Sequence, residues 1–253
     1  MSTFKNISRF FFSIYGFTVF LGLMFLLLPF FIYSFLLGPV KGGNILYAVC
    51  RVWADVFFFL AGIRHLNIYE EKHDLRKPSI FVSNHISYLD IPMIMKVIRK
   101  QHVRILGKSA MAKIPIFGFI YKQGAILVNR ENADKRAESV QELIYFLDNK
   151  ISVFICPEGT FNTTHQPLKN FYDGAFRIAI ETQKPIKPVL FLDTYDRLNY
   201  ESIFSLNPGK CRAVFLAETS TEGLGIHDVQ LLREKIFRQM EEGLIRYGAS
   251  WIK

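Results

Sequence analysis

The first apolar pattern along the chain is a run from Phe10 to Val40 without a charged residue, bounded by Arg9 and Lys41. At a rise of about 1.5 Å per residue, a helix of this length is able to cross the hydrocarbon core of a bilayer. The run is too long for a signal peptide and no small-residue cleavage site follows it, so we expect it to be retained. Its helix-breaking residues are Gly16, Gly22 and Pro29. The run therefore predicts either one kinked span or a shallow re-entrant element.

Directly after this run, apolar residues recur at helical spacing. They are Ile45, Leu46, Val49, Val52, Trp53, Val56, Phe57 and Leu60. The pattern predicts an amphipathic helix that lies at the membrane interface. Basic residues flank the first run on both sides, with Lys5 and Arg9 before it and Lys41 after it, so they give no preference for one side. Two helices that enter one leaflet and return to the same side suit basic residues at both ends of the run. A single-span anchor stays open as the simpler alternative.

From residue 65 onward the pattern changes to short β-rich runs that alternate with helical ones. We predict strands at Leu66–Tyr69, Ser79–Ser83, Val103–Leu106, Ala125–Val128, Ser152–Cys156, Pro188–Leu192 and Arg212–Leu216. We predict helices at Ile91–Arg99, Ala133–Asn149, Ala175–Thr182 and His227–Tyr247. This alternation is typical of an α/β domain with a largely parallel sheet flanked by helices. We therefore divide the 253 residues into membrane-attaching helices at 1–64 and a single α/β domain at 65–253.

Composition indicates contact with a membrane and with an anionic partner. Half of the residues are hydrophobic, 25 are Phe, and the formal net charge is +9 with a pI near 9.4. A basic chain favours nucleic acid, an acidic lipid surface or phosphorylated substrates. Nucleic acid is disfavoured because the sequence has no zinc-finger spacing, no RNP-like aromatic strand and no basic recognition helix. We therefore expect a membrane lipid as partner and no nucleic acid.

Cysteine and histidine spacing bears on disulfides, metals and compartment. Only Cys50, Cys156 and Cys211 occur, at wide spacing and without a C-x-x-C pair. This odd number predicts neither a disulfide framework nor a zinc site, and it fits a reducing, cytosol-facing domain. The histidines other than His85 lack the spacing of metal ligands. They are His65, His73, His102, His165 and His227. We expect no metal site and no bound cofactor.

One strand-to-helix loop carries a histidine and a carboxylate together. The segment Asn84-His85-Ile86-Ser87-Tyr88-Leu89-Asp90 follows the predicted strand that ends at Ser83. Neutral imidazole is suited to take a proton near pH 7, so His85 is a candidate general base. A carboxylate at Asp90 that accepts the other ring N–H would fix the tautomer and stabilise the imidazolium. A structural alternative stays open, in which Asp90 is a helix N-cap and His85 an ordinary, partly buried residue.

This loop and three later blocks together resemble the glycerolipid acyltransferase family, typified by bacterial 1-acylglycerol-3-phosphate acyltransferase. The family's first block is N-H-x4-D, matched by Asn84, His85 and Asp90. The later blocks follow in the family's order at Gly124–Arg130, Pro157–Thr160 and Lys184–Val189, and family-like features before the second block are Lys108, Lys113 and Pro115–Gly118. The resemblance covers residues 65 to 192.

The resemblance implies a reaction and a set of substrate contacts. It implies that His85, held by Asp90, acts directly as base without an acyl-enzyme intermediate. The implied donor is acyl-CoA or acyl-acyl carrier protein, and the implied acceptor is the hydroxyl of a lysophospholipid, 1-acylglycerol-3-phosphate. The substrate-binding residues that it implies are Asn84, Lys108, Arg130, Glu158, Gly159 and Thr160.

These implied contacts have physical roles and structural alternatives. Arg130 offers a fork of donors suited to an anionic headgroup, although an Arg before Glu131 is also an ordinary surface residue. Glu158 either contacts the hydroxyls of the acceptor or orders the loop around His85, and Gly159 lets the backbone approach a ligand. Pro-Glu-Gly-Thr is also common turn chemistry, so a purely structural role for this block stays open.

One departure from the family concerns the acceptor. Where the family has Arg after Gly-Thr, this sequence has Phe161, so a charge-assisted contact is missing at that position. Arg130, Lys169 or Arg177 can still supply a cation for a phosphate. The alternative acceptor is a lysolipid without a phosphate, such as a lyso-amino-acid lipid that is esterified on a hydroxyl.

Two other classes of function are weaker alternatives. A serine hydrolase also uses His and Asp, but the sequence has no G-x-S-x-G motif, and Ser109 lacks that context. A non-catalytic membrane lipid-binding protein explains the apolar N-terminus but has no need of both His85 and Asp90. We therefore expect a membrane-associated acyltransferase whose active site faces the bilayer. Its α/β domain is expected at the cytoplasmic face, on the inner membrane if the source is bacterial.

Overall fold

A seven-stranded sheet organises the computed structural model, which describes residues 2–72, 74, 76–114, 117–128 and 133–252, without the side chains of 2–5 and 133–136. The strand order within these residues is β1-β7-β6-β2-β5-β3-β4. Their bounds are β1 Ile63–Tyr69, β2 Ile80–Ser83, β3 Val103–Lys108, β4 Ala125–Val128, β5 Ser152–Ile155, β6 Ile186–Phe191 and β7 Gly209–Phe215. Neighbouring strands are parallel except for the antiparallel pair β6 and β7. The predicted α/β domain with a largely parallel sheet is confirmed.

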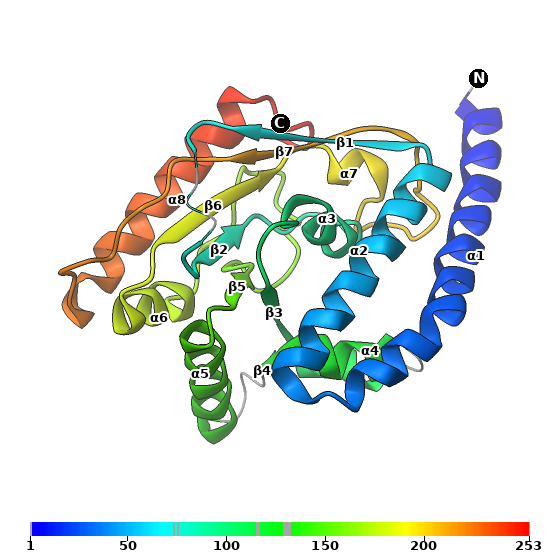
Figure 1. Ribbon diagram of the computed structural model, residues 1–253. Coiled ribbons are helices and arrows are strands. Elements are labelled where there is room, and N and C mark those ends of the chain that lie inside the picture. The colour runs from blue at the N-terminus through cyan, green and yellow to red at the C-terminus, as the bar shows by residue number, and fades with distance from the viewer. Residues whose placement is uncertain (1, 73, 75, 115–116, 129–132, 253) are drawn as a thin grey trace.

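Helices cover both faces of this sheet (Figure 1). One face carries α5 Ala133–Asp148, α6 Gly174–Thr182 and α8 Val229–Arg246. The other carries α2 Gly43–Leu60, α3 Asp90–Val97 and α4 Phe117–Gly124, with α1 Ser2–Phe35 packed against α2. The short α7 is Thr194–Arg197, and single turns lie at Gly38–Gly42, Ser109–Lys113 and Ile226–Asp228.

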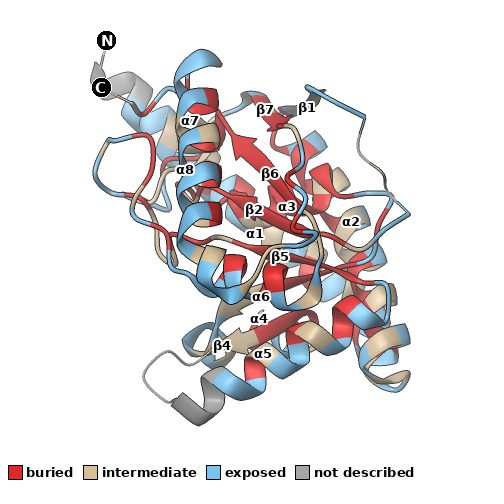
Figure 2. Ribbon diagram, turned by 90° about the vertical axis from the view of Figure 1, so that its left-hand side faces the viewer, coloured by how far each residue is buried: buried red, intermediate tan, exposed pale blue. Residues whose placement is uncertain are grey.

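The strand pattern explains these two layers. Successive strand residues point to opposite faces, so Ile80 and Val82 of β2 pack in the cluster under α5, α6 and α8. Phe81, between them, packs in the cluster under α2 and α3. The strands therefore form a buried layer between helices with exposed outer sides (Figure 2).

The N-terminal apolar run forms a helical hairpin. α1 continues through Pro29, and the turn at Gly38–Gly42 leads back into α2. By length and composition alone, Asn6–Phe35 with a mean hydropathy of 2.2 and Gly38–Leu60 with a mean hydropathy of 1.4 could each cross a membrane. The predicted pair of N-terminal helices is therefore present.

The second of these helices divides its apolar residues between the core and the surface. Leu46, Trp53 and Phe57 are buried in the cluster that also contains residues of α1 and α3, whereas Val52 and Leu60 are exposed. The prediction that the apolar side of this helix lies at the membrane interface is therefore wrong for Leu46, Trp53 and Phe57, which pack inside the protein. That side holds the hairpin on the α/β domain, because burial of large apolar side chains is strongly stabilising.

Candidate active site

The loops after β2 and β5 meet at one edge of the sheet. β2 and β5 are parallel neighbours, with Val82 opposite Ile155. Parallel strands end at the same edge, so the Asn84–Asp90 loop after β2 lies beside the segment that begins at Pro157 after β5. Two blocks that are distant in sequence are therefore neighbours in the structure.

His85 and Asp90 are in direct contact. Nδ1 of His85 lies 2.8 Å from Oδ2 of Asp90, and the same oxygen accepts the backbone N–H of Ile86 at 2.8 Å and of Ser87 at 2.9 Å. Asp90 is completely buried, whereas 21% of the His85 side chain is exposed. An ionised carboxylate only accepts hydrogen bonds, so Nδ1 carries the ring proton and Nε2 keeps its lone pair. This is the state that a general base requires.

The carboxylate of Asp90 does not cap α3. Asp90 is the first residue of that helix, Leu89 occupies the cap position, and no side-chain capping bond is present. The carboxylate instead turns back to the amides of Ile86 and Ser87, which closes the loop around His85. The alternative of an ordinary helix N-cap is therefore wrong, because the carboxylate binds the imidazole and two amides of its own loop.

Glu158 holds the backbone of the same loop. Its Oε1 accepts the N–H of His85 and its Oε2 accepts the N–H of Lys169, both at 2.9 Å. Glu158 is 2% exposed, and burial raises the pKa of its carboxyl to about 8 against the opposite effect of the two backbone donors. Gly159 follows with a φ of +70°, which glycine adopts without strain, and Thr160 accepts a hydrogen bond from Nζ of Lys169 at 2.9 Å. Of the two predicted roles of Glu158, this geometry favours ordering of the loop.

Aromatic rings border the imidazole. The ring of Phe161 lies 4.4 Å from that of His85, centroid to centroid, and Tyr88 packs edge-on against Phe161 at 5.1 Å. Tyr200, from the segment between α7 and β7, stacks on Phe161 at 6.1 Å. Tyr88 lies inside the first sequence block, but no motif marks Tyr200, so nothing in the sequence predicts its place here.

Known proteins share the sequence that carries this geometry. The model of the acyltransferase family matches residues 65–192, which make up half of the chain and include both loops around His85. This chain belongs to the acyltransferase family.

Relatives of this chain come from animals and bacteria. The putative 1-acyl-sn-glycerol-3-phosphate acyltransferase acl-2 of Caenorhabditis elegans is 30% identical over 173 residues, which cover 67% of this chain and 61% of the relative. The 1-acyl-sn-glycerol-3-phosphate acyltransferase of Haemophilus influenzae is 32% identical over 123 residues, which cover 48% of this chain and 50% of the relative. The match thus spans about three fifths of the first relative and half of the second.

A solved structure shares the fold of this chain. It is the crystal structure of the 1-acyl-sn-glycerophosphate acyltransferase PlsC from Thermotoga maritima, with a TM-score of 0.75. The similarity covers the whole of both chains at 20% sequence identity. The N-terminal hairpin is therefore part of the shared fold.

The other predicted binding residues lie in different surroundings. Asn84 is 1% exposed, and its amide exchanges hydrogen bonds of 3.0 and 2.9 Å with the backbone of Phe191, which ties β2 to β6. Lys108 is exposed at the carboxyl end of β3, at the same edge of the sheet as His85. Arg130 and part of the Pro115–Gly118 segment lie outside the described residues.

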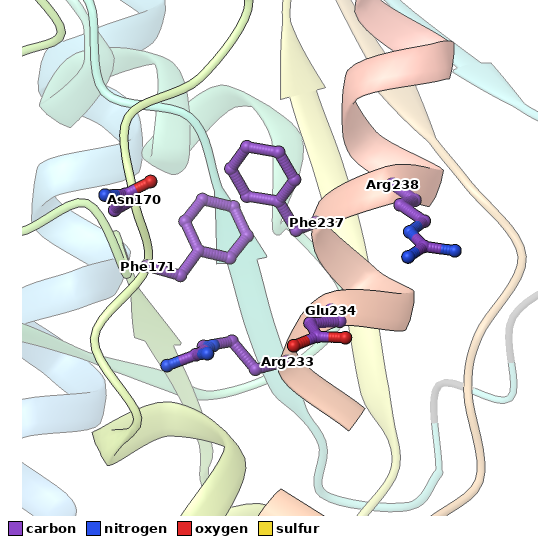
Figure 3. A pocket seen from close by; sticks show the side chains of 6 residues that line it. All are labelled: Asn170, Phe171, Arg233, Glu234, Phe237 and Arg238. Atoms are coloured by element: carbon purple, nitrogen blue, oxygen red, sulfur yellow. The ribbon is translucent and has the colours of Figure 1, made fainter. Parts of the chain in front are cut away.

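A hollow of about 340 Å³ lies between α8 and the segment before α6. Figure 3 shows the six residues that line it, which are Asn170, Phe171, Arg233, Glu234, Phe237 and Arg238. The rings of Phe171 and Phe237 pack edge to face at 5.1 Å. His85 and Asp90 are not part of this lining, so the hollow is separate from the candidate site. Over the described part of the chain, no three His, Cys, Asp or Glu side chains are grouped to hold a metal ion.

Proposed function

We propose that this protein is a membrane-attached 1-acylglycerol-3-phosphate O-acyltransferase that forms phosphatidic acid. The fatty acyl group comes from acyl-CoA or acyl-acyl carrier protein and goes to the free hydroxyl of the lysophospholipid. The observation that carries the proposal is the 2.8 Å contact between Nδ1 of His85 and the buried Oδ2 of Asp90. The names of the relatives from C. elegans and H. influenzae support the same reaction.

The proposed reaction needs no covalent enzyme intermediate. Nε2 of His85 takes the proton of the acceptor hydroxyl as the hydroxyl oxygen attacks the thioester carbonyl. The carbon–sulfur bond of the tetrahedral intermediate then breaks, and the carrier thiol leaves with the proton that His85 returns. Between these steps the carboxylate of Asp90 stabilises the imidazolium. General-base assistance of this kind contributes about a hundred- to ten-thousandfold in rate.

Two contacts of α1 with the α/β domain support a hairpin that lies in one leaflet. Oγ of Ser13 accepts the N–H of Leu206 at 3.0 Å, and the ring of Phe35 stacks on that of Phe119 of α4 at 4.2 Å. Ser13 and Phe35 are about 33 Å apart at 1.5 Å per residue, close to the thickness of about 30 Å of a hydrocarbon core. A spanning α1 would draw the α/β domain through the bilayer. α1 therefore lies along the membrane, with its exposed apolar side in lipid.

The α/β domain belongs at the cytoplasmic face in this proposal. Cys50, Cys156 and Cys211 are all free, as thiols are in a reducing compartment. The net charge of +9 favours an anionic lipid surface.

Phe161 favours a second candidate acceptor, a lyso-amino-acid lipid or another lysolipid without a phosphate. Its apolar ring lies 4.4 Å from the imidazole, in the block where the family has a guanidinium. An acceptor screen with one acyl-CoA compares lysophosphatidate, other lysophospholipids and lyso-amino-acid lipids. If the natural acceptor lacks a phosphate, Phe161→Arg should raise kcat/KM for lysophosphatidate about tenfold relative to the phosphate-free acceptors. A wild-type preference for lysophosphatidate contradicts this second candidate.

The catalytic role of His85 is tested by His85→Ala, with product analysis by mass spectrometry. We expect turnover to fall at least about a hundredfold, whereas a tenfold or smaller loss contradicts the proposal. His227→Ala is the matched control, because His227 also faces a carboxylate, Asp228, but has a side chain that is 85% exposed. Free fatty acid without diacyl product would indicate a hydrolase, and no turnover in the unmodified protein would indicate a lipid-binding protein.

A further inference from the structure

The segment between α7 and β7, residues 199–206, forms a turn that is fixed by its own hydrogen bonds. Oδ1 of Asn199 accepts the N–H groups of Glu201 at 3.1 Å and of Ser202 at 3.2 Å. Oγ of Ser205 accepts the N–H of Asn199 at 2.9 Å and donates to the carbonyl of Ser202 at 2.6 Å. The side chains at the tip of this turn are therefore held in place by the backbone.

The tip of the 199–206 segment is apolar. Ile203 is 57% exposed and Phe204 is 45% exposed. The one charged residue of the segment is Glu201, and its carboxylate accepts a hydrogen bond from the hydroxyl of Tyr195 at 2.9 Å. Two large apolar side chains that a rigid turn presents at the surface indicate an apolar partner.

On one side, the 199–206 segment packs against α1. The rings of Phe10 and Phe204 lie 4.9 Å apart, and Oγ of Ser13 binds the N–H of Leu206. A β-carbon at Gly16 would overlap the side chain of Leu206, so glycine permits the close approach of α1. Residues one turn away from Phe10 on the same face of α1 are also exposed and apolar, namely Ile7 and Ile14.

On its other side, the 199–206 segment meets the loop of the candidate base. Asn199 forms an antiparallel bridge with Ser87, next to the amides that Asp90 binds. Tyr200 stacks on Phe161, which in turn contacts the imidazole. A row of aromatic rings therefore leads from the 199–206 segment to the candidate active site.

We propose that the 199–206 segment is a second membrane contact, whose tip enters the leaflet that holds α1, and that the lysolipid acceptor reaches His85 along this row of rings. The inference rests on the proposed attachment of α1 to lipid. The partner is lipid and not a second copy of the chain, because the tip continues the exposed side of a 30-residue helical stretch with a mean hydropathy of 2.2. The segment then sets the distance of the base from the membrane, since it contacts both.

The first test is a depth measurement on the full-length protein, which needs no turnover. Ile203→Cys, labelled with an environment-sensitive fluorophore, is compared with Leu231→Cys on α8, where Leu231 is 66% exposed. The parent protein, treated identically, gives the background from the native cysteines. In protein bound to phosphatidylcholine–phosphatidylglycerol vesicles, we expect blue-shifted emission at position 203 that brominated acyl chains quench, and water-like emission at position 231.

Two outcomes of this measurement overturn the inference. One is water-like emission at position 203 in vesicle-bound protein. The other is blue-shifted emission that brominated lipid does not quench, together with a dimer in detergent, which assigns the tip to a second copy of the chain.

The second test is kinetic. In the double variant Ile203→Ser and Phe204→Ser, the vesicle concentration for half-maximal rate should rise about tenfold, because two apolar anchors are lost. The double variant should lose less of its rate with a short-chain acceptor dispersed as monomers than with the acceptor in vesicles. An equal loss of rate on both acceptors overturns the inference. Leu231→Ser is the matched control, and Ile203→Ser alone replaces the double variant if the latter unfolds at a lower temperature. Failure of the proposed function can be told apart from failure of this inference. In the first case the unmodified protein shows no turnover, and the depth measurement still reports whether position 203 lies in lipid.

Discussion

Replacing Asp90 by Asn removes the charge beside His85 and keeps the shape of the site. All three hydrogen bonds to the carboxylate end on one oxygen, from Nδ1 of His85 and the amides of Ile86 and Ser87. An asparagine whose carbonyl oxygen takes that position keeps the three bonds and the imidazole tautomer. Its NH2 group then takes the place of Oδ1, a buried atom with no hydrogen-bond partner in the described part of the chain. The substitution therefore isolates the contribution of the charge.

The geometry bounds the size of the effect. For the 2.8 Å between Nδ1 and Oδ2, Coulomb's law at an effective dielectric constant of about 20 gives at most about 6 kcal/mol between carboxylate and imidazolium. The lower bound is the difference between a charged and a neutral hydrogen bond, about 1 kcal/mol. Because about 1.4 kcal/mol corresponds to tenfold in rate, we expect kcat to fall about a hundred- to a thousandfold. KM should change little, since the imidazolium forms only as the reaction proceeds.

The assay is the release of free CoA thiol from acyl-CoA as the lysolipid concentration is varied. Asp228→Asn is the matched control, because Asp228 lies 3.3 Å from Nε2 of His227 in a pair whose histidine is exposed. Surface pairs of this kind contribute little, so this variant should keep kcat within about twofold. Thermal unfolding of both variants verifies that each is folded under the assay conditions.

The reasoning about charge is refuted if Asp90→Asn is folded and keeps kcat within about fivefold of the wild type, because about 1 kcal/mol, the lower bound, corresponds to about fivefold. A rise in KM at unchanged kcat refutes it as well, because that result would assign Asp90 to substrate binding. A loss of kcat equal to that of Asp228→Asn would show that the effect is not specific to the carboxylate beside His85.

Two further predictions concern stability. Burial raises the pKa of Glu158 from 4.5 to about 8, so between these pH values the folded state binds one proton more than the unfolded state. The free energy of unfolding should therefore fall as the pH rises from about 4.5 to 8, by up to about 1.4 kcal/mol per pH unit. Denaturant titrations across this pH range should show this fall in the free energy of unfolding in the wild type and not in Glu158→Gln. An equal fall in both proteins contradicts the prediction. Arg104 is 1% exposed and binds the carbonyls of Pro39 and Val40 in the hairpin turn at 3.0 and 3.1 Å. Arg104→Met should lower the free energy of unfolding by about 2–4 kcal/mol, and a loss below about 1 kcal/mol in the same titration contradicts that role.

Local periodicity predicted most of the elements. The run Ala125–Val128 is a strand with the predicted bounds, and Ala133–Asp148 is the predicted helix one residue shorter. α4 was not predicted, because Phe117–Gly124 is short and contains Gly118 and Gly124, which have weak helix propensity. Tertiary packing stabilises it instead, since Ile120 is buried in the core cluster and Phe119 stacks on Phe35.

The candidate site also combines a contact that the sequence predicted with contacts that only the structure shows. The pairing of His85 with Asp90 was predictable, because the two residues are only five positions apart in the chain. The tether from Glu158 to the N–H of His85 spans 73 residues, and the amide bonds of Asn84 to Phe191 span 107. The substrate contacts of Glu158 and Asn84 stay predictions. In the structure the polar side-chain atoms of both residues bind backbone groups.

The sequence by itself determined the order of strands and helices, the apolar N-terminal run and the loop that holds the imidazole and its carboxylate. These features depend on periodicity and on contacts within a few residues, which the chain encodes locally. Only the tertiary structure decided that β7 lies between β1 and β6 and that α1 contacts the α/β domain through Ser13 and Phe35. It also decided that Phe161 lies beside His85 and that Tyr200 stacks on Phe161. The physical reason is that strand pairing and the docking of side chains join segments far apart along the chain, and their partners are chosen by the packing of the whole core.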